Sequence, residues 1–163
     1  MLFRSWHVAA GYRATVGPMS EVPEHDHKID TGKSVLNFDE LGMVQPGMAR
    51  IMPEIGARIW KAYYAGKAKN KPLAKFQIKE AVNLMEMGVL LRPKYTDNMY
   101  KFIEEEVAAV QKCVDDEDWD GFEPAFNAMV EAANAYHGVY DKAFLVWKIP
   151  SDPPPDMDMT PRG

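Results

Sequence analysis

Apolar residues recur at intervals of three or four positions in four stretches of the chain, each about 20 residues long, between residues 48 and 141. This period places the apolar side chains of each stretch on one face of an α-helix. In residues 48–66 that face carries Met48, Ile51, Met52, Ile55, Ile59, Ala62 and Tyr63. The pattern therefore predicts four amphipathic helices.

Capping and stop signals mark the limits of the other three helices. Asn70 is a candidate N-cap for the second helix, which should end before Pro93 because the residue preceding a proline disfavours helical backbone. The third helix is expected to run from Thr96, as its N-cap, to about residue 117. Asp118 is the candidate cap of the fourth helix. Its apolar positions are Trp119, Phe122, Phe126, Met129, Ala133, Tyr136 and Tyr140.

The connections between these helices are short, which makes consecutive helices antiparallel neighbours. The sequence therefore predicts an all-α protein, an up-down-up-down antiparallel four-helix bundle over residues 47–142. Residues 1–46 show no period and are expected to form an extended, largely irregular N-terminal arm. Residues 143–163 are rich in proline and are expected to form an extended C-terminal tail.

Composition narrows the function classes. The chain has 163 residues and a net charge of −5, which argues against a nucleic-acid partner or an anionic membrane surface. No apolar run approaches the roughly 20 residues that a membrane span needs. The single cysteine, Cys113, excludes an intramolecular disulfide and a multi-cysteine metal site. No phosphate-binding loop or hydrolase motif occurs, so we expect a non-enzymatic protein.

The start of the chain bears on the cellular compartment. His7 and Arg13 interrupt the apolar residues of the first eighteen positions, which makes a poor signal peptide, and Met19 is an alternative start. We expect a cytoplasmic protein, with the periplasm as the alternative.

The second helix has apolar residues on more than one face. We assign its core stripe to Leu73, Phe76, Leu84, Met87 and Leu91, which leaves Ile78, Val82, Met85 and Val89 as a second stripe. Trp60 and Tyr64 similarly lie off the main stripe of the first helix. A second apolar face indicates a partner, so we expect a homodimer or a partner subunit bound through the first two helices. The alternative is that the terminal arms cover these residues.

His137 is the strongest candidate for chemistry. It falls on the apolar stripe near the end of the fourth helix, which in an antiparallel bundle lies beside Met48 and Met52 at the start of the first helix. Met87 and Met99 should lie at the same level. A histidine surrounded by methionines can ligate haem iron in a His/Met pair or hold a soft metal such as Cu(I). The competing interpretation is structural, because histidine is favourable at a helix C-terminus and methionine is a common core residue.

The fourth helix resembles the last helix of cytochrome c′-type bundles. The residues that carry the resemblance are Asp118, Trp119, Phe122, Phe126 and the run Ala133-Asn134-Ala135-Tyr136-His137, with a similar stretch over residues 65–74. In that family the corresponding run is Cys-x-x-Cys-His, which attaches haem covalently. Ala133 and Tyr136 stand where the two cysteines would be, so the resemblance implies a degenerate member without thioether links. Only His137 carries over, as an axial ligand.

The chain is also similar to cytochrome b562-type bundles, which hold haem non-covalently between a methionine of the first helix and a histidine of the fourth. Met52 and His137 match that arrangement. Tyr136 and Tyr140 could instead fill the pocket, which would leave a haem-less relative.

Two acidic features of the sequence are further candidates for chemistry. Glu80 interrupts the assigned core stripe of the second helix, where a carboxylate could handle a proton or bind a metal, although such an acid more often pairs with a neighbour. The run Glu24-His25-Asp26-His27 has metal-binding residue types but no second half. No Glu-x-x-His occurs, which excludes a ferritin-type di-iron site.

Together these observations predict a cytochrome c′/b562-like bundle that binds a small apolar ligand or non-covalent haem near His137. Met52, Met48 and Tyr136 are the further cofactor-binding residues, and we expect no metal unless haem is bound. The cofactor stays open between haem b and none, with none favoured. The alternative function is a haem-less structural or interaction module, either a homodimer or an accessory subunit of a larger complex.

Overall fold

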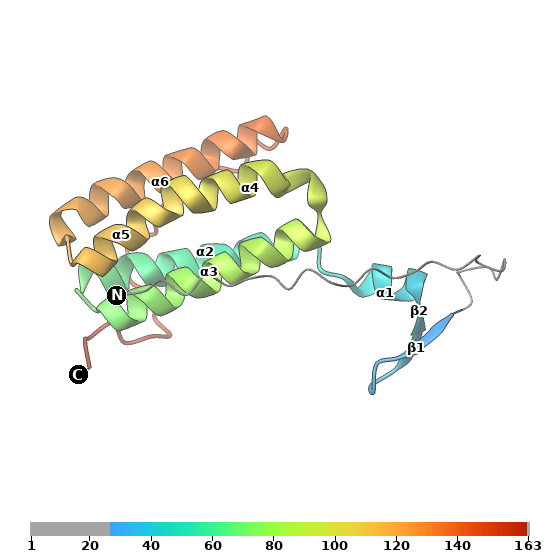
Figure 1. Cartoon of the computed structure of the whole chain (residues 1–163). Helices are drawn as coiled ribbons and strands as arrows, with labels where there is room; N and C mark the ends of the chain where they lie inside the picture. Colours follow the sequence, from blue (N-terminus) through green and yellow to red (C-terminus); the bar gives the residue numbers. More distant parts are fainter. Residues whose placement is uncertain (1–26, 163) are drawn as a thin grey trace, which may run out of the picture. The chain divides into compact units, whose positions relative to one another are not determined.

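The computed structural model describes residues 27–162, which are mostly helical and include one small two-stranded sheet (Figure 1). The chain divides into two compact units, one ending at Val44 and the other beginning at Gln45. Met19 and the residues Glu24, His25 and Asp26 lie outside the described part of the chain.

The first unit contains a β-hairpin and a short helix. Strand β1 (Lys28–Asp30) pairs antiparallel with β2 (Val35–Asn37). Helix α1 (Phe38–Val44) follows, and Asn37 and Glu40 cap its start, because each side chain accepts a hydrogen bond of 2.8 Å from the other residue's backbone N–H. The all-α prediction therefore missed a small sheet, since strands of three residues are too short to show a period.

The second unit is built from helices whose outer limits agree with the predicted ranges, although the predicted third helix is divided into shorter segments. They are α2 (Met48–Lys67), α3 (Lys71–Leu91), α4 (Thr96–Phe102), α5 (Ala108–Asp116) and α6 (Trp119–Val139). The 3₁₀ turn η2 (Pro93–Tyr95) leads into α4, and the π-helical segment η3 (Ile103–Val107) joins α4 to α5 without a break. Figure 1 shows α2 alongside α3, and α6 alongside α4 and α5.

Two of the three predicted caps are confirmed. The side chain of Asn70 accepts from the backbone N–H of Leu73, and that of Asp118 accepts from Gly121. Thr96 is not an N-cap: its hydroxyl donates to the carbonyl of Pro93 at 2.6 Å, because the chain has already turned through η2.

The core of this unit lies between these helices, and its buried aliphatic and aromatic residues include Ile51, Ile55, Ile59, Val110, Val114, Phe122, Phe126 and Met129. The buried face of α3 carries Ala74, Gln77, Ile78, Ala81 and Met85. The two stripes of α3 were therefore assigned the wrong way round. Phe76 of the predicted core stripe is 51% exposed, whereas Ile78, Met85 and Val89 of the stripe assigned to a partner are buried. Alanine and glycine on the buried face allow α3 to approach its neighbours closely, and hydrophobicity alone does not indicate which of two apolar stripes does so.

The chain after α6 packs back onto the helices and belongs to the same unit. Trp60 donates its indole N–H to the carbonyl of Asp152 at 2.9 Å, and the Tyr64 hydroxyl donates to the carbonyl of Pro150 at 2.9 Å. These two aromatic residues of α2, which suggested a partner, are thus in contact with the chain's own C-terminal segment. No helix within residues 27–162 is both long enough and apolar enough to cross a membrane.

Candidate ligand-binding site

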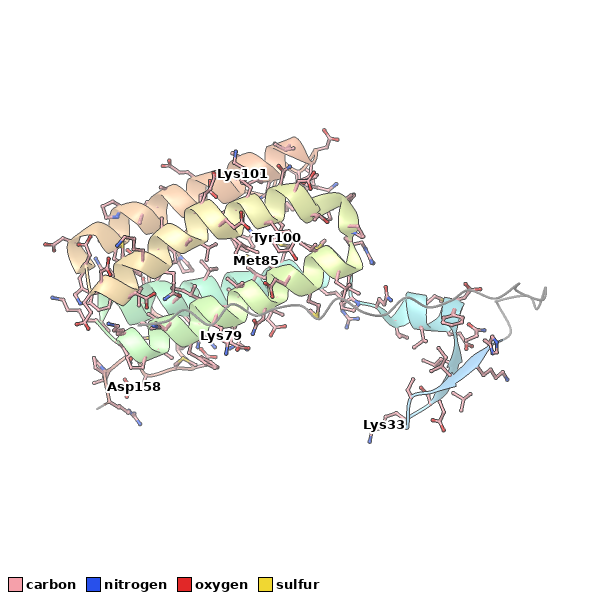
Figure 2. The ribbon with its side chains drawn as sticks, viewed as in Figure 1. Lys33, Lys79, Met85, Tyr100, Lys101 and Asp158 are labelled. Atoms are coloured by element: carbon pink, nitrogen blue, oxygen red, sulfur yellow. The ribbon has the colours of Figure 1, made fainter. Side chains whose placement is uncertain are left out.

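A cavity of about 240 Å³ lies among α2, α3, the start of α4, α6 and the segment that follows α6. Its surface is almost entirely carbon and sulfur. The sulfur comes from Met48, Met52, Met85, Met99 and Met129, which reach it from four helices. Met85, labelled in Figure 2, is the contribution of α3 and is 3% exposed.

His137 lies at this cavity with one ring nitrogen fixed. Its Nδ1 is 2.7 Å from the carbonyl oxygen of Leu145. A carbonyl can only accept, so Nδ1 carries a proton, and in the neutral imidazole Nε2 therefore presents a lone pair. Among the described residues no group donates to Nε2. A histidine anchored through Nδ1 to a backbone carbonyl has the arrangement that metal-ligating histidines commonly show.

Four residues proposed from the sequence as cofactor-binding line this one cavity: Met48, Met52, Tyr136 and His137. Met99, expected at the same level, lines it too. Met87 does not line the cavity. It is 37% exposed, because it lies outside the buried face of α3.

The polar groups of the lining come from the end of α6, from the chain just after it, and from the turn and first residues that begin α4. The Asn98 amide donates to the Tyr140 hydroxyl at 2.9 Å, and the rings of Tyr95 and Tyr140 pack edge to face with centroids 4.7 Å apart. Lys142 is exposed and is the one charged side chain of the lining. The cavity is therefore apolar along its length and polar at one end.

Trp147 forms a wall that sequence reasoning missed. Its backbone N–H donates to Asn134 Oδ1 at 2.7 Å, and Asn134 Nδ2 donates to its carbonyl at 2.9 Å. Its ring lies 5.9 Å from that of His137, centroid to centroid, and within 3.2 Å of where a Cβ on Gly56 would stand. The prolines that follow it led to the prediction of an extended tail. The apolar run Leu145-Val146-Trp147 just before them is the sequence feature that could have indicated packing against the helices.

Trp147 also borders a second hollow, an open groove of about 650 Å³ between α2, α6 and the C-terminal segment. The walls of the cavity and the groove have six residues in common, among them Met52, Val130 and Trp147. The Trp147 side chain thus stands between a small apolar cavity and a larger surface groove.

The other candidates do not form a site. Glu80 is partly exposed and contacts Asn83, so it is not the isolated buried acid that the helical pattern indicated. Burial raises the pKa of the Cys113 thiol, which keeps it protonated and unreactive. Within the described residues, no three His, Cys, Asp or Glu side chains cluster as metal ligands would.

Comparison with known protein families, with curated proteins and with solved structures finds no match for this chain. The resemblance to cytochrome c′ and b562 bundles therefore stays a prediction from the residues.

Proposed function

We propose that this protein is a non-enzymatic helical bundle that binds a small apolar or planar ligand in the cavity beside His137. The observation that carries the proposal is that His137, whose Nε2 accepts from no described residue, lines an otherwise apolar cavity of about 240 Å³. Ligand sites combine apolar walls with a few placed polar groups in this way.

The proposal includes an up-down-up-down antiparallel topology for the four helical stretches, with α4, η3 and α5 counted as one. The short links support it: Ala68 to Asn70 join α2 to α3, and Glu117 and Asp118 join α5 to α6. Packing of α2 against α6 and of α3 against α5 agrees with such a bundle.

Non-covalent haem is one ligand to consider. His137 Nε2 fits the role of an axial ligand, and Met48 or Met52 could supply a thioether. The volume fits poorly, because an engineered cavity of about 150 Å³ holds benzene and a porphyrin is several times larger. A smaller planar molecule therefore suits the side chains as they stand, and haem would require Trp147 or Tyr136 to move.

The test is a titration of the full chain with naphthalene, followed by tryptophan fluorescence and calorimetry. We expect saturable binding that is lost in Ala133→Phe, which fills the cavity, and kept in Ala128→Phe. Ala128 is exposed on the same helix and does not line the cavity, so it is a matched control. Equal binding by both variants would contradict the proposal.

Haem is tested separately by absorbance after addition to the purified protein. An axial bond to His137 predicts a shifted Soret band in the wild type and its loss in His137→Ala. If the two spectra agree, the ligand is not haem held by His137.

A second function, an interaction module, is favoured by the outer face of α3. Phe76 and Leu90 on this helix are 51% and 79% exposed. If α3 docks a second copy or another subunit, sizing chromatography of the wild type should give an oligomer and Leu90→Glu a monomer. A wild-type monomer would count against a homodimer through α3.

A further inference from the structure

We infer that the cavity takes an aromatic alcohol of one or two rings, whose hydroxyl donates a hydrogen bond to Nε2 of His137. The inference rests on the ligand-binding function proposed above and narrows the ligand to one chemical class. It follows from the hydrogen-bonding positions of His137 and Tyr140 that no described residue occupies.

The first requirement is a hydrogen-bond donor. Nδ1 donates its proton to the carbonyl oxygen of Leu145, so the lone pair of Nε2 is the one hydrogen-bonding position of the ring still without a partner among the described residues. No described residue donates to it. An acceptor beside carbon and sulfur walls is satisfied only by a donor on the ligand or by water, and a hydrocarbon ligand would displace the water without replacing its bond.

The second requirement is a group that can also accept. The Tyr140 hydroxyl accepts from Asn98, which leaves its own proton available at the polar end of the cavity. A hydroxyl both donates and accepts, so one such group can serve His137 and Tyr140 together. A carboxylate has no proton for Nε2 and would place a negative oxygen against that lone pair. Lys142 could attract an anion, but it is exposed and stays hydrated.

Size and shape restrict the ligand further. The volume of about 240 Å³ exceeds the roughly 150 Å³ that accommodates benzene, which corresponds to one or two rings. Rings of Tyr95, Phe102, Tyr136 and Trp147 line the walls and offer faces and edges to a flat molecule.

The experiment compares three probes with a common ring system, naphthalene, 2-naphthol and 2-naphthoate, at pH 8, where free imidazole is neutral. We expect 2-naphthol to bind the wild type about three- to ten-fold more tightly than naphthalene, the range of one hydrogen bond. In His137→Ala this preference should fall, because only Tyr140 is left to bond the hydroxyl. His27→Ala, which changes an exposed histidine outside the cavity, should behave as the wild type does.

The possible results separate the alcohol inference from the ligand-binding function on which it rests. If naphthalene and 2-naphthol bind the wild type equally, the alcohol inference is overturned while the ligand-binding function stands. If neither binds, both fail. A preference as large in His137→Ala as in the wild type, or tighter binding of 2-naphthoate, also overturns the inference.

A measurement on the wild type avoids dependence on the folding of the variant. Nitrogen NMR of the imidazole should show the Nε2 resonance of His137 moving on addition of 2-naphthol while Nδ1 stays hydrogen-bonded. An unmoved Nε2 resonance at saturating 2-naphthol would overturn the inference.

Discussion

Gly66 of α2 and Phe122 of α6 are in such close contact that a Cβ on Gly66 would stand 2.2 Å from the Phe122 ring. Both residues are buried, and Phe122 is 1% exposed. The two helices can approach here only because position 66 has no side chain. This contact lies at the opposite end of α2 from the cavity.

Gly66→Ala should therefore destabilise the protein. Alanine favours helix by up to about 1 kcal/mol over glycine, but overpacking against a buried ring costs about 1–3 kcal/mol or more. We expect a net loss of about 1–2 kcal/mol in the free energy of unfolding, measured by urea denaturation. Gly138→Ala is the control, since nothing lies within 4 Å of its Cβ, and it should be neutral or stabilising. Equal effects of the two substitutions would refute the packing argument.

Tyr63 should titrate far above free tyrosine. Burial, and then its 2.8 Å hydrogen bond to Glu123, raise its pKa from 10.0 to about 12. Because the folded pKa is raised, the stabilisation is complete below pH 10 and is lost as the pH rises toward 12. Absorbance of the phenolate, compared between the wild type and Glu123→Gln, measures the shift. The variant should ionise Tyr63 at lower pH; an unchanged titration would mean that Glu123 contributes nothing.

Asn134→Ala should loosen the wall between cavity and groove. The substitution removes both hydrogen bonds to the backbone of Trp147, each worth about 0.5–1.5 kcal/mol. We expect a loss of about 1–3 kcal/mol in the free energy of unfolding and a red shift of tryptophan fluorescence. Asn127→Ala, on the exposed side of α6, should change neither quantity. A wild-type spectrum for Asn134→Ala would show that Trp147 is held by its ring alone.

Removal of the chain after Ile149 should expose the aromatic residues of α2. Trp60 and Tyr64 would lose their carbonyl partners at Asp152 and Pro150, and Lys61 would lose its ion pair with Asp156. We expect a lower free energy of unfolding and concentration-dependent self-association, because an apolar surface becomes available. Denaturation and sizing chromatography test this. A truncated chain as stable and as monomeric as the full chain would mean that the segment does not protect α2.

Local patterns predicted much of the helical part. The three-four spacing located the helices, and the side chains of Asn70 and Asp118 cap them as expected, because capping depends on residues only three positions apart. The expectation that His137, Met48 and Met52 would lie near one another also followed from helical rise and short links. The buried face of α3 was not predictable in this way. Ala74 and Ala81 are buried because their small side chains allow close packing, and a hydrophobic pattern does not single out such residues.

The sequence by itself determined the helical period, the helix limits and the presence of methionines at the same level of the helices as His137. Only the tertiary structure decided the state of that residue, since the carbonyl that fixes Nδ1 comes from Leu145 and the adjoining wall from Trp147. Both lie in a segment that proline content marked as extended. Local sequence encodes backbone preference, whereas the partner of a polar atom depends on which distant segment packs beside it.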